Sequence, residues 1–285
     1  MTHEFNMGLN SQEEWAWLVA IDLFLGGSGG GLFFLYMFFD LSPSAALFSL
    51  ALVILGAVVL LSELGHPLRA WRAIARPSTS WISRGVIFVT LFVVIGFLSI
   101  APSFSALSGL LWNPASLGGR ILALIAGISA FMVILYPGFV LAASPAIPFW
   151  NSPLLPVLFL SQALLGASGI ALLFSPLGLY DAALPALSSL AELLIVINLV
   201  LVAIHLLTLR GSGLPGREAV KLLNHGILGL TFGGGVLLLG MALPLMIGLW
   251  FPSWVVVVGV FILIGTLLYR YCILKAGVYV PFPLT

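Results

Sequence analysis

Four ionisable side chains lie within, or at the ends of, long apolar stretches of this sequence: Asp22, Glu63, His66 and Tyr136. Such groups are costly inside a membrane, so each is a candidate for function. Glu63 and His66 are three residues apart, which places them on one face of a helix. A carboxylate, an imidazole and a phenol can together hydrogen-bond the two carbonyls of a quinone and exchange its two protons. These residue types therefore favour a quinone site.

Each residue alone also has a structural interpretation. Asp22 is consistent with a backbone cap or an arginine partner, and Tyr136 with an aromatic residue at the membrane interface. Glu63 and His66 are consistent with loop-edge residues that pair with a nearby arginine. The quinone hypothesis depends on whether the four groups meet in the fold.

The elements that position these groups are predicted to be membrane helices. Of the 285 residues, 61% are hydrophobic and 7% are charged, whereas soluble domains carry about 25% charged residues. The apolar runs are about 20 residues long, which favours helices over the roughly 10-residue alternating strands of a barrel. The sequence therefore predicts an all-α membrane protein with eight transmembrane helices. The predicted spans are 14–39, 44–65, 82–102, 119–142, 154–175, 184–208, 222–249 and 253–274.

The N-terminal stretch is interpreted as part of a retained first helix. It has no basic region before its apolar run and no recognisable cleavage site, both of which a signal peptide would show. Ser11 and Glu14 have the spacing of a capping box, which predicts that the first helix begins there.

The basic residues are distributed unequally between the two sides of the membrane. Eight spans place both termini on one side, here called side A. Only Arg120, among the basic residues near the span ends, falls on the other side. Those on side A are Arg69, Arg72, Arg76, Arg84, Arg210, Arg217, Lys221, Arg270 and Lys275. The positive-inside rule then predicts that side A and both termini are cytoplasmic, although docking of a partner would also select basic loops. Alternating helix directions bring the four ionisable groups to similar depth near side A.

A second polar set lies in the C-terminal half. Glu192, His205 and Arg270 are weaker candidates for proton transfer, and structural pairing is the alternative. His205 and His225 flank one predicted loop, so a single haem held between them is a further alternative.

Two of the predicted spans are rich in glycine, at 26–31 and at 232–235. Small residues at four-residue spacing favour close helix packing. The alternative is that the missing side chains leave room for a flat ligand. The single cysteine, Cys272, excludes a cysteine-ligated iron–sulfur cluster on this chain alone. If the protein handles electrons, the metal centres belong to a partner.

Four segments carry a resemblance to a known family. They are SQEEWAWLVAIDLFLGGSGGG at 11–31, SELGHPLRAWRAIARPSTSWISRG at 62–85, YPGFVLAASPAIPFWN at 136–151 and RYCILKAGVYVP at 270–281. In this order the segments resemble the NrfD/PsrC family, the membrane subunits of polysulphide-reductase-like molybdoenzymes, which are related to the membrane anchor of dimethyl sulfoxide reductase.

The resemblance implies two four-helix bundles, at 1–150 and 151–285, with a menaquinone or ubiquinone site in the first bundle. It implies no haem. The family's quinone-binding tyrosine matches Tyr136, and its carboxylate on the second helix matches Glu63. Where the polysulphide-reductase branch has a histidine on its first helix, this sequence has Asp22.

The resemblance also implies partners in the inner membrane of a bacterium or archaeon. These are a ferredoxin-like subunit with four iron–sulfur clusters and a molybdopterin catalytic subunit, and no nucleic acid is expected. Arg69, Arg72 and Arg76 are the predicted docking residues, while Trp17 and Trp150 are the predicted walls of the quinone site.

The rival function from another class is a transporter of ions or small solutes. Such a protein binds its solute near the midplane, between repeated and broken helices. The glycine runs of the first and seventh spans are a faint repeat signal. However, the polar residues gather near side A, which favours the quinone hypothesis.

Overall fold

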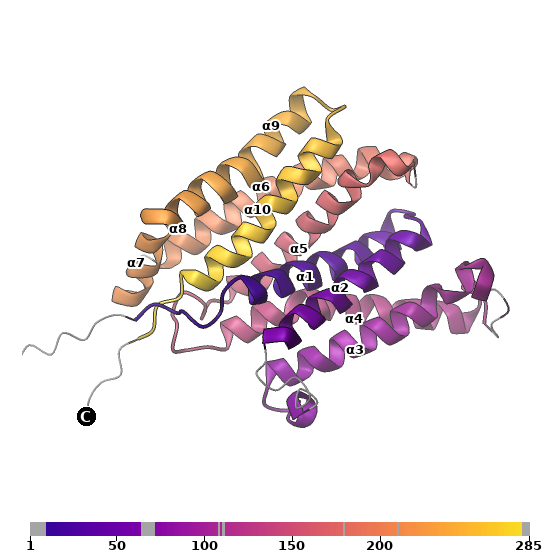
Figure 1. Ribbon diagram of the computed structural model, residues 1–285, viewed down its shortest axis with the longest axis horizontal. Coiled ribbons are helices and arrows are strands. Elements are labelled where there is room, and N and C mark those ends of the chain that lie inside the picture. The colour runs from indigo at the N-terminus through magenta and orange to yellow at the C-terminus, as the bar shows by residue number, and fades with distance from the viewer. Residues whose placement is uncertain are drawn as a thin grey trace, which may run out of the picture.

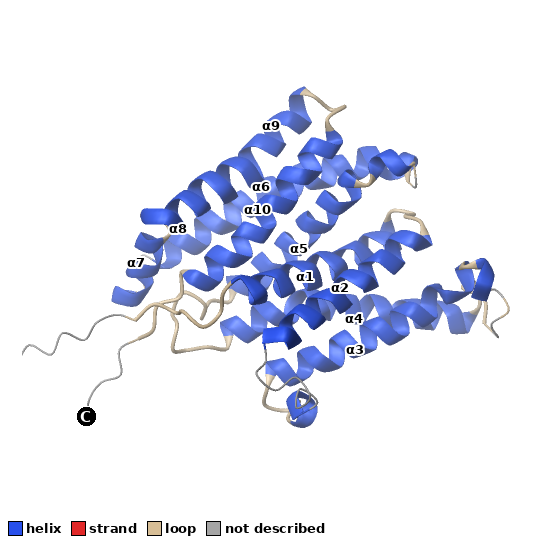
Figure 2. Ribbon diagram, viewed as in Figure 1, coloured by secondary structure: helices blue, strands red, loops and turns tan. Residues whose placement is uncertain are grey.

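The computed structural model describes residues 10–63, 72–107, 109, 112–178, 180–209 and 211–280. In these residues the chain is helical, and eight of its helices are long and apolar enough to cross a membrane (Figures 1 and 2). The first six spans contain α1 Trp17–Phe38, α2 Pro43–Glu63, α3 Trp81–Ile100, α4 Leu117–Ala142, α5 Leu154–Leu173 and α6 Leu184–Leu209. The seventh consists of α8 Gly226–Leu230, the π-helical η6 Thr231–Ala242 and α9 Leu243–Trp250, and the eighth is α10 Val255–Lys275.

Shorter helices connect the spans. The amphipathic α7 Gly213–Leu222 lies between the sixth and seventh spans and was not expected from the sequence. The remaining pieces are single turns at η2 Ala101–Ser103, η3 Ser105–Leu107, η4 Ser175–Leu177 and η5 Asp181–Ala183. The prediction of an all-α protein with eight membrane helices is confirmed in the described part of the chain.

The predicted start of the first helix is wrong. The helix begins at Trp17, and the preceding Ala16 provides no side-chain cap. Ser11 instead forms an isolated antiparallel bridge with Val278, and the amide of Gln12 donates to the carbonyl of Gly277 at 2.8 Å. This segment therefore pairs with the C-terminal part of the chain and does not begin the helix.

Helices α1 and α5 form the centre of the molecule. Over their most apolar windows, 61% of α1 and 78% of α5 are buried, compared with 28% of α2. The glycines of α1 make this possible, because Gly29, Gly30 and Gly31 lie directly against α2, α4 and α5, respectively. The packing interpretation of this glycine run is confirmed at these three positions.

The first four spans pack on one another, as do the last four, and α5 also contacts α1 and α4. One hydrophobic core cluster includes residues from both groups, so the two halves share an extensive interface. The predicted division into two bundles near residue 150 stays a prediction.

The seventh and eighth spans make their closest contact at two glycines. A Cβ on either Gly240 or Gly265 would collide with the Cα of the other. We expect Gly265→Val to destabilise the protein by about 1–3 kcal/mol, since overpacking forces the helices apart. Thermal unfolding in detergent would measure this, with Gly234→Val as control because a Cβ at Gly234 has none of the described atoms within 4 Å. Equal melting temperatures for the two variants would contradict the prediction.

Candidate functional site

The candidate site begins at Asp22, on the second turn of α1. This residue is 8% exposed, and it faces α2 at Gly56, where an added Cβ would lie 3.1 Å from Oδ1 of Asp22. In the described part of the chain, no side chain forms a hydrogen bond or an ion pair with the Asp22 carboxylate. The carboxylate is therefore available to a ligand.

Tyr136 on α4 provides the second polar group. Its side chain is half-buried and lies within electrostatic range of the Asp22 carboxylate. The ring lies so close to Gly85 of α3 that a Cβ at this glycine would overlap ring atoms. The first four helices therefore contribute together, because α1 and α4 carry the polar groups while α2 and α3 present glycines to them.

Aromatic contacts fix the register between α3 and α4. Trp81 stacks on Phe139, with ring centroids 4.5 Å apart and planes 11° apart. One turn further along each antiparallel helix are Gly85 and Tyr136, so the stack brings them opposite each other. The guanidinium of Arg84 lies over the Trp81 ring at 4.4 Å and donates to the carbonyls of the preceding loop at 2.7 Å. These contacts hold the start of α3 beside Tyr136.

Open space lies next to Asp22 along α1. Gly26 is one turn further along the helix, and a Cβ there would have no atom of the described residues within 4 Å. The neighbouring glycines of α1 are instead packed against other helices. The arrangement offers a carboxylate and a phenol, which can accept and donate hydrogen bonds, beside a glycine that leaves room for a flat group.

The structure does not place the other two predicted quinone ligands beside Asp22 and Tyr136. Glu63 is the last residue of α2, is exposed, and lies about two turns beyond Gly56. His66 and Arg69 lie outside the described residues. Glu63 and His66 therefore stay predictions as quinone ligands.

The two predicted wall tryptophans contact the C-terminal part of the chain. Trp17 stacks on Tyr271 of α10, with centroids 4.0 Å apart. Trp150 is buried, stacks on Trp15, and donates through Nε1 to the carbonyl of Ile273 at 2.8 Å. These contacts join α1 and the loop after α4 to α10, and a quinone contact of either tryptophan stays a prediction.

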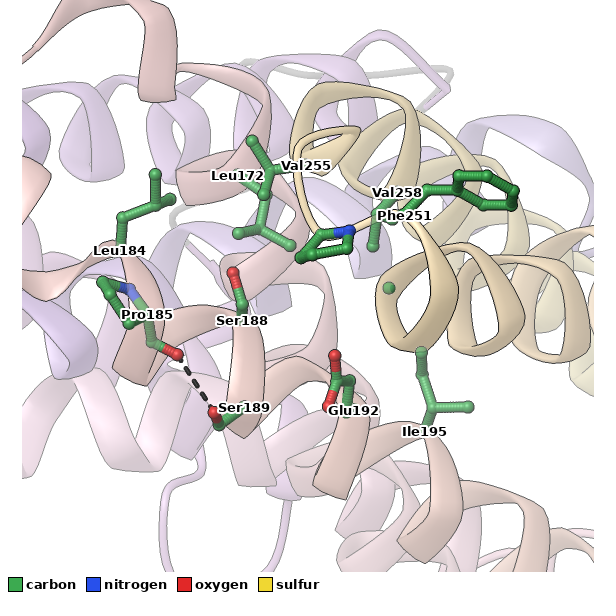
Figure 3. A pocket seen from close by; sticks show the side chains of 12 residues that line it. Leu172, Leu184, Pro185, Ser188, Ser189, Glu192, Ile195, Phe251, Val255 and Val258 are labelled. Atoms are coloured by element: carbon green, nitrogen blue, oxygen red, sulfur yellow. Dashed lines mark hydrogen bonds between the residues drawn. The ribbon is translucent and has the colours of Figure 1, made fainter.

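The second polar set occupies three separate environments. Glu192 lines a cavity between α6 and α9 (Figure 3). Arg270 is buried, with its guanidinium over the Phe159 ring at 4.1 Å and its Nη2 donating to the Phe159 carbonyl at 3.3 Å. His205 is buried against the ring of Phe149, with centroids 5.2 Å apart. Their roles in proton transfer stay predictions.

The two histidines considered as haem ligands have different surroundings. His205 lies in the core, whereas His225 is exposed at the start of α8 and its Nδ1 is 3.0 Å from the Lys221 carbonyl. Among the described residues, no group of three or more histidine, cysteine or acidic side chains is arranged to hold a metal ion.

The predicted docking residues Arg72 and Arg76 are exposed in the loop between α2 and α3. This loop lies at the end of the bundle where α1 begins and α10 ends. Both arginines therefore lie at the same end as Asp22 and Tyr136. Docking through them stays a prediction.

Sequence reasoning missed the two glycines that adjoin the polar pair. Gly56 and Gly85 are single glycines within apolar helices, and a single glycine gives no indication of what it faces. The available signal was their depth, because counting residues from side A places both near Asp22 and Tyr136.

Comparison with known proteins identifies the family. A family model described as "Polysulphide reductase, NrfD" matches residues 6–281, from the segment before α1 to the segment after α10. The chain belongs to the NrfD family. It is also 30% identical to Protein NrfD of Escherichia coli (strain K12) over 186 residues, which cover 56% of this chain and 58% of that protein. The NrfD match includes each of the candidate site residues above, and it confirms the family predicted from the four sequence segments.

Proposed function

We propose that this NrfD-family protein is the quinone-reactive membrane subunit of a multi-subunit molybdenum or tungsten oxidoreductase. Electrons pass between the membrane quinone pool and a partner iron–sulfur subunit. The observation that supports this most strongly is the proximity of Asp22 and Tyr136 among the first four helices, each beside a glycine, with open space at Gly26 among the described residues.

The chemistry required of the protein is binding and proton exchange. A bound menaquinone or ubiquinone supplies two-electron chemistry, and it takes up or releases two protons. In this proposal, the Tyr136 hydroxyl donates a hydrogen bond to one carbonyl of the headgroup. The Asp22 carboxyl group exchanges a proton at the other carbonyl, where no competing partner within the described residues holds it. Glu63 and His66, near side A, are proposed to carry protons to and from the loop.

The electron-carrying metal centres are assigned to partner subunits because this chain lacks the cysteines that would hold an iron–sulfur cluster. Its single cysteine, Cys272, is buried in α10. We assign the iron–sulfur clusters to a ferredoxin-like subunit with four clusters, which connects to a molybdopterin subunit. The exposed Arg72 and Arg76, together with Arg69, form the proposed docking surface. Its position at side A keeps the partner cluster near the quinone.

We further propose that side A faces the cytoplasm. The segments beside the two termini meet there, because Ser11 pairs with Val278 and Lys275 donates through Nζ to the Glu13 carbonyl at 3.1 Å. Lys275 and the exposed loop arginines add positive charge to this face, as the positive-inside rule requires of a cytoplasmic side.

Binding of a quinol analogue tests the site directly. We expect purified protein to quench the fluorescence of a hydroxyquinoline N-oxide, and Tyr136→Phe to weaken its affinity by about tenfold, since a hydrogen bond to a ligand contributes about 1 kcal/mol or more. Tyr36→Phe is the matched control, because Tyr36 lies further along α1 against the ring of Phe33. Equal affinities for wild type and Tyr136→Phe would remove Tyr136 from the site.

A further inference from the structure

A cavity of about 340 Å³ opens among α5, α6, α9 and α10. It lies where α6 and α10 begin and α9 ends, and so at the opposite end of the bundle from Asp22 (Figure 1). Glu192 is the ionisable residue of its lining, and its carboxylate points into the space (Figure 3). A Cβ at Gly248 would lie 2.9 Å from Oε1 of Glu192, so this glycine leaves room for the acid.

The helix faces that line the cavity continue into the interior of the last four helices. On α6, Asn198 is one turn beyond the lining residue Ile195. On α5, Ser161 is eleven residues, about three turns, before the lining residue Leu172 and so on the same face. On α10, Tyr269 is eleven residues beyond the lining residue Val258.

These interior positions hold polar groups without full hydrogen bonding. Asn198 is 0% exposed and donates through Nδ2 to Ser161 Oγ at 2.8 Å, but its Oδ1 has no partner among the described residues. The Tyr269 hydroxyl is also buried and lacks a partner in the described part of the chain. The ring nitrogens of the buried His205 form no hydrogen bond of good geometry with the described residues, although the backbone of Phe149 lies beside the ring. Buried polar atoms of this kind are costly when unpaired, and ordered water is their usual partner.

The four groups lie at successive depths. Counting along the helices, Glu192 is about two turns from the cavity end, Asn198 is near the middle of α6, and Tyr269 and His205 are within about two turns of side A. The Arg270 guanidinium is not among them, because it lies against Gly27 of α1 and Phe159 of α5.

We propose that the last four helices contain a hydrated proton path. Protons enter at the Glu192 carboxyl from the membrane face opposite the quinone site. They pass by way of water held at Asn198 and Tyr269, and leave near His205 at side A. No bond other than O–H and N–H is made or broken, and a membrane potential drives the transfer. The path uses none of the proposed quinone-binding residues, so it stands or fails independently of the proposed quinone chemistry.

Hydration of the path is tested with single cysteines. Cys272 is the single cysteine of the sequence and is buried. In a Cys272→Ser background, the introduced cysteine is therefore the only thiol that can react. We expect a charged methanethiosulfonate reagent to modify Ile195→Cys and Asn198→Cys in reconstituted vesicles. Leu193→Cys and Val200→Cys should remain unmodified, because both positions are exposed on the outer surface of α6 and so face lipid. Lack of modification at Asn198→Cys would overturn the proposal.

Conduction is tested with the full chain in liposomes. A potassium gradient and valinomycin set the membrane potential, and an internal pH dye reports proton entry. We expect flux above that of empty liposomes, lowered about 100-fold by Glu192→Gln, since removal of a proton-transferring group typically costs this much. Glu218→Gln is the matched control, because Glu218 pairs with Lys221 on the surface at 3.4 Å. Wild-type flux equal to that of empty liposomes, or unchanged flux in Glu192→Gln, would overturn the proposal even if quinol binding is normal.

Discussion

Asp22→Asn should lower quinone-linked turnover by about 100-fold or more, because asparagine keeps the shape of the side chain but cannot exchange the proton. The assembled complex should remain intact, since the Asp22 carboxylate supports no hydrogen bond to a side chain within the described residues. Turnover would be measured as oxidation or reduction of a short-chain quinol analogue by membrane vesicles, normalised to the amount of complex.

Asp40→Asn provides the matched control for this substitution. Asp40 follows α1 at the opposite membrane face and has a positive φ of 48°, a conformation that asparagine also tolerates. We therefore expect full activity from Asp40→Asn. Full activity in Asp22→Asn as well would show that Asp22 takes no part in proton exchange, whereas loss of the complex itself would show a structural role.

Gly85→Ala should reduce turnover by about 100-fold, although it adds a single methyl group. The new Cβ would occupy the volume of the Tyr136 ring, so the ring must move away from its position near Asp22. Misplacement of a reacting group by about 1 Å costs roughly this factor. The quinol-analogue assay measures the loss, and the binding titration should show weakened affinity in the same variant.

Two comparisons keep this result interpretable. Gly234→Ala introduces the same methyl group in the seventh span, where no atom of the described part of the chain lies within 4 Å, and should leave turnover unchanged. Thermal unfolding of Gly85→Ala would show whether the fold survives. Wild-type turnover with wild-type stability would mean that Tyr136 has room to adjust and that the position of its ring does not limit the reaction.

The membrane helices could be predicted because hydrophobic length alone decides them. The predicted spans differ from the observed helices mainly at the ends, and the largest error was at Ser11, whose role depends on pairing with Val278 far along the chain. The interfacial α7 was missed because it is short and amphipathic, and the apolar-run criterion selects only long, uniformly apolar segments.

The candidate site was predictable in part. Alternating helix directions were enough to place Asp22 and Tyr136 at one depth, and in the structure the two side chains lie within electrostatic range of each other. Depth does not fix the rotation of a helix, however, so the facing positions of Gly56 and Gly85 required the structure. The same limit applies to Trp150, whose hydrogen bond to the Ile273 carbonyl depends on a residue more than 100 positions away.

The buried central position of α1 has a consequence for the synthesis of the protein. Helix α1 reaches the membrane first, yet its partner α5 is made only after three further spans. These two helices have the lowest mean hydropathy of the eight, 1.8 each. Asp22 faces α2, but Gly27 and Gly31 pack on Ala163 of α5 and would face lipid until α5 is made, so we expect α1 to be retained by the insertion machinery. Nascent chains arrested before α5 should therefore crosslink to the insertase through α1, and chains arrested after it should not.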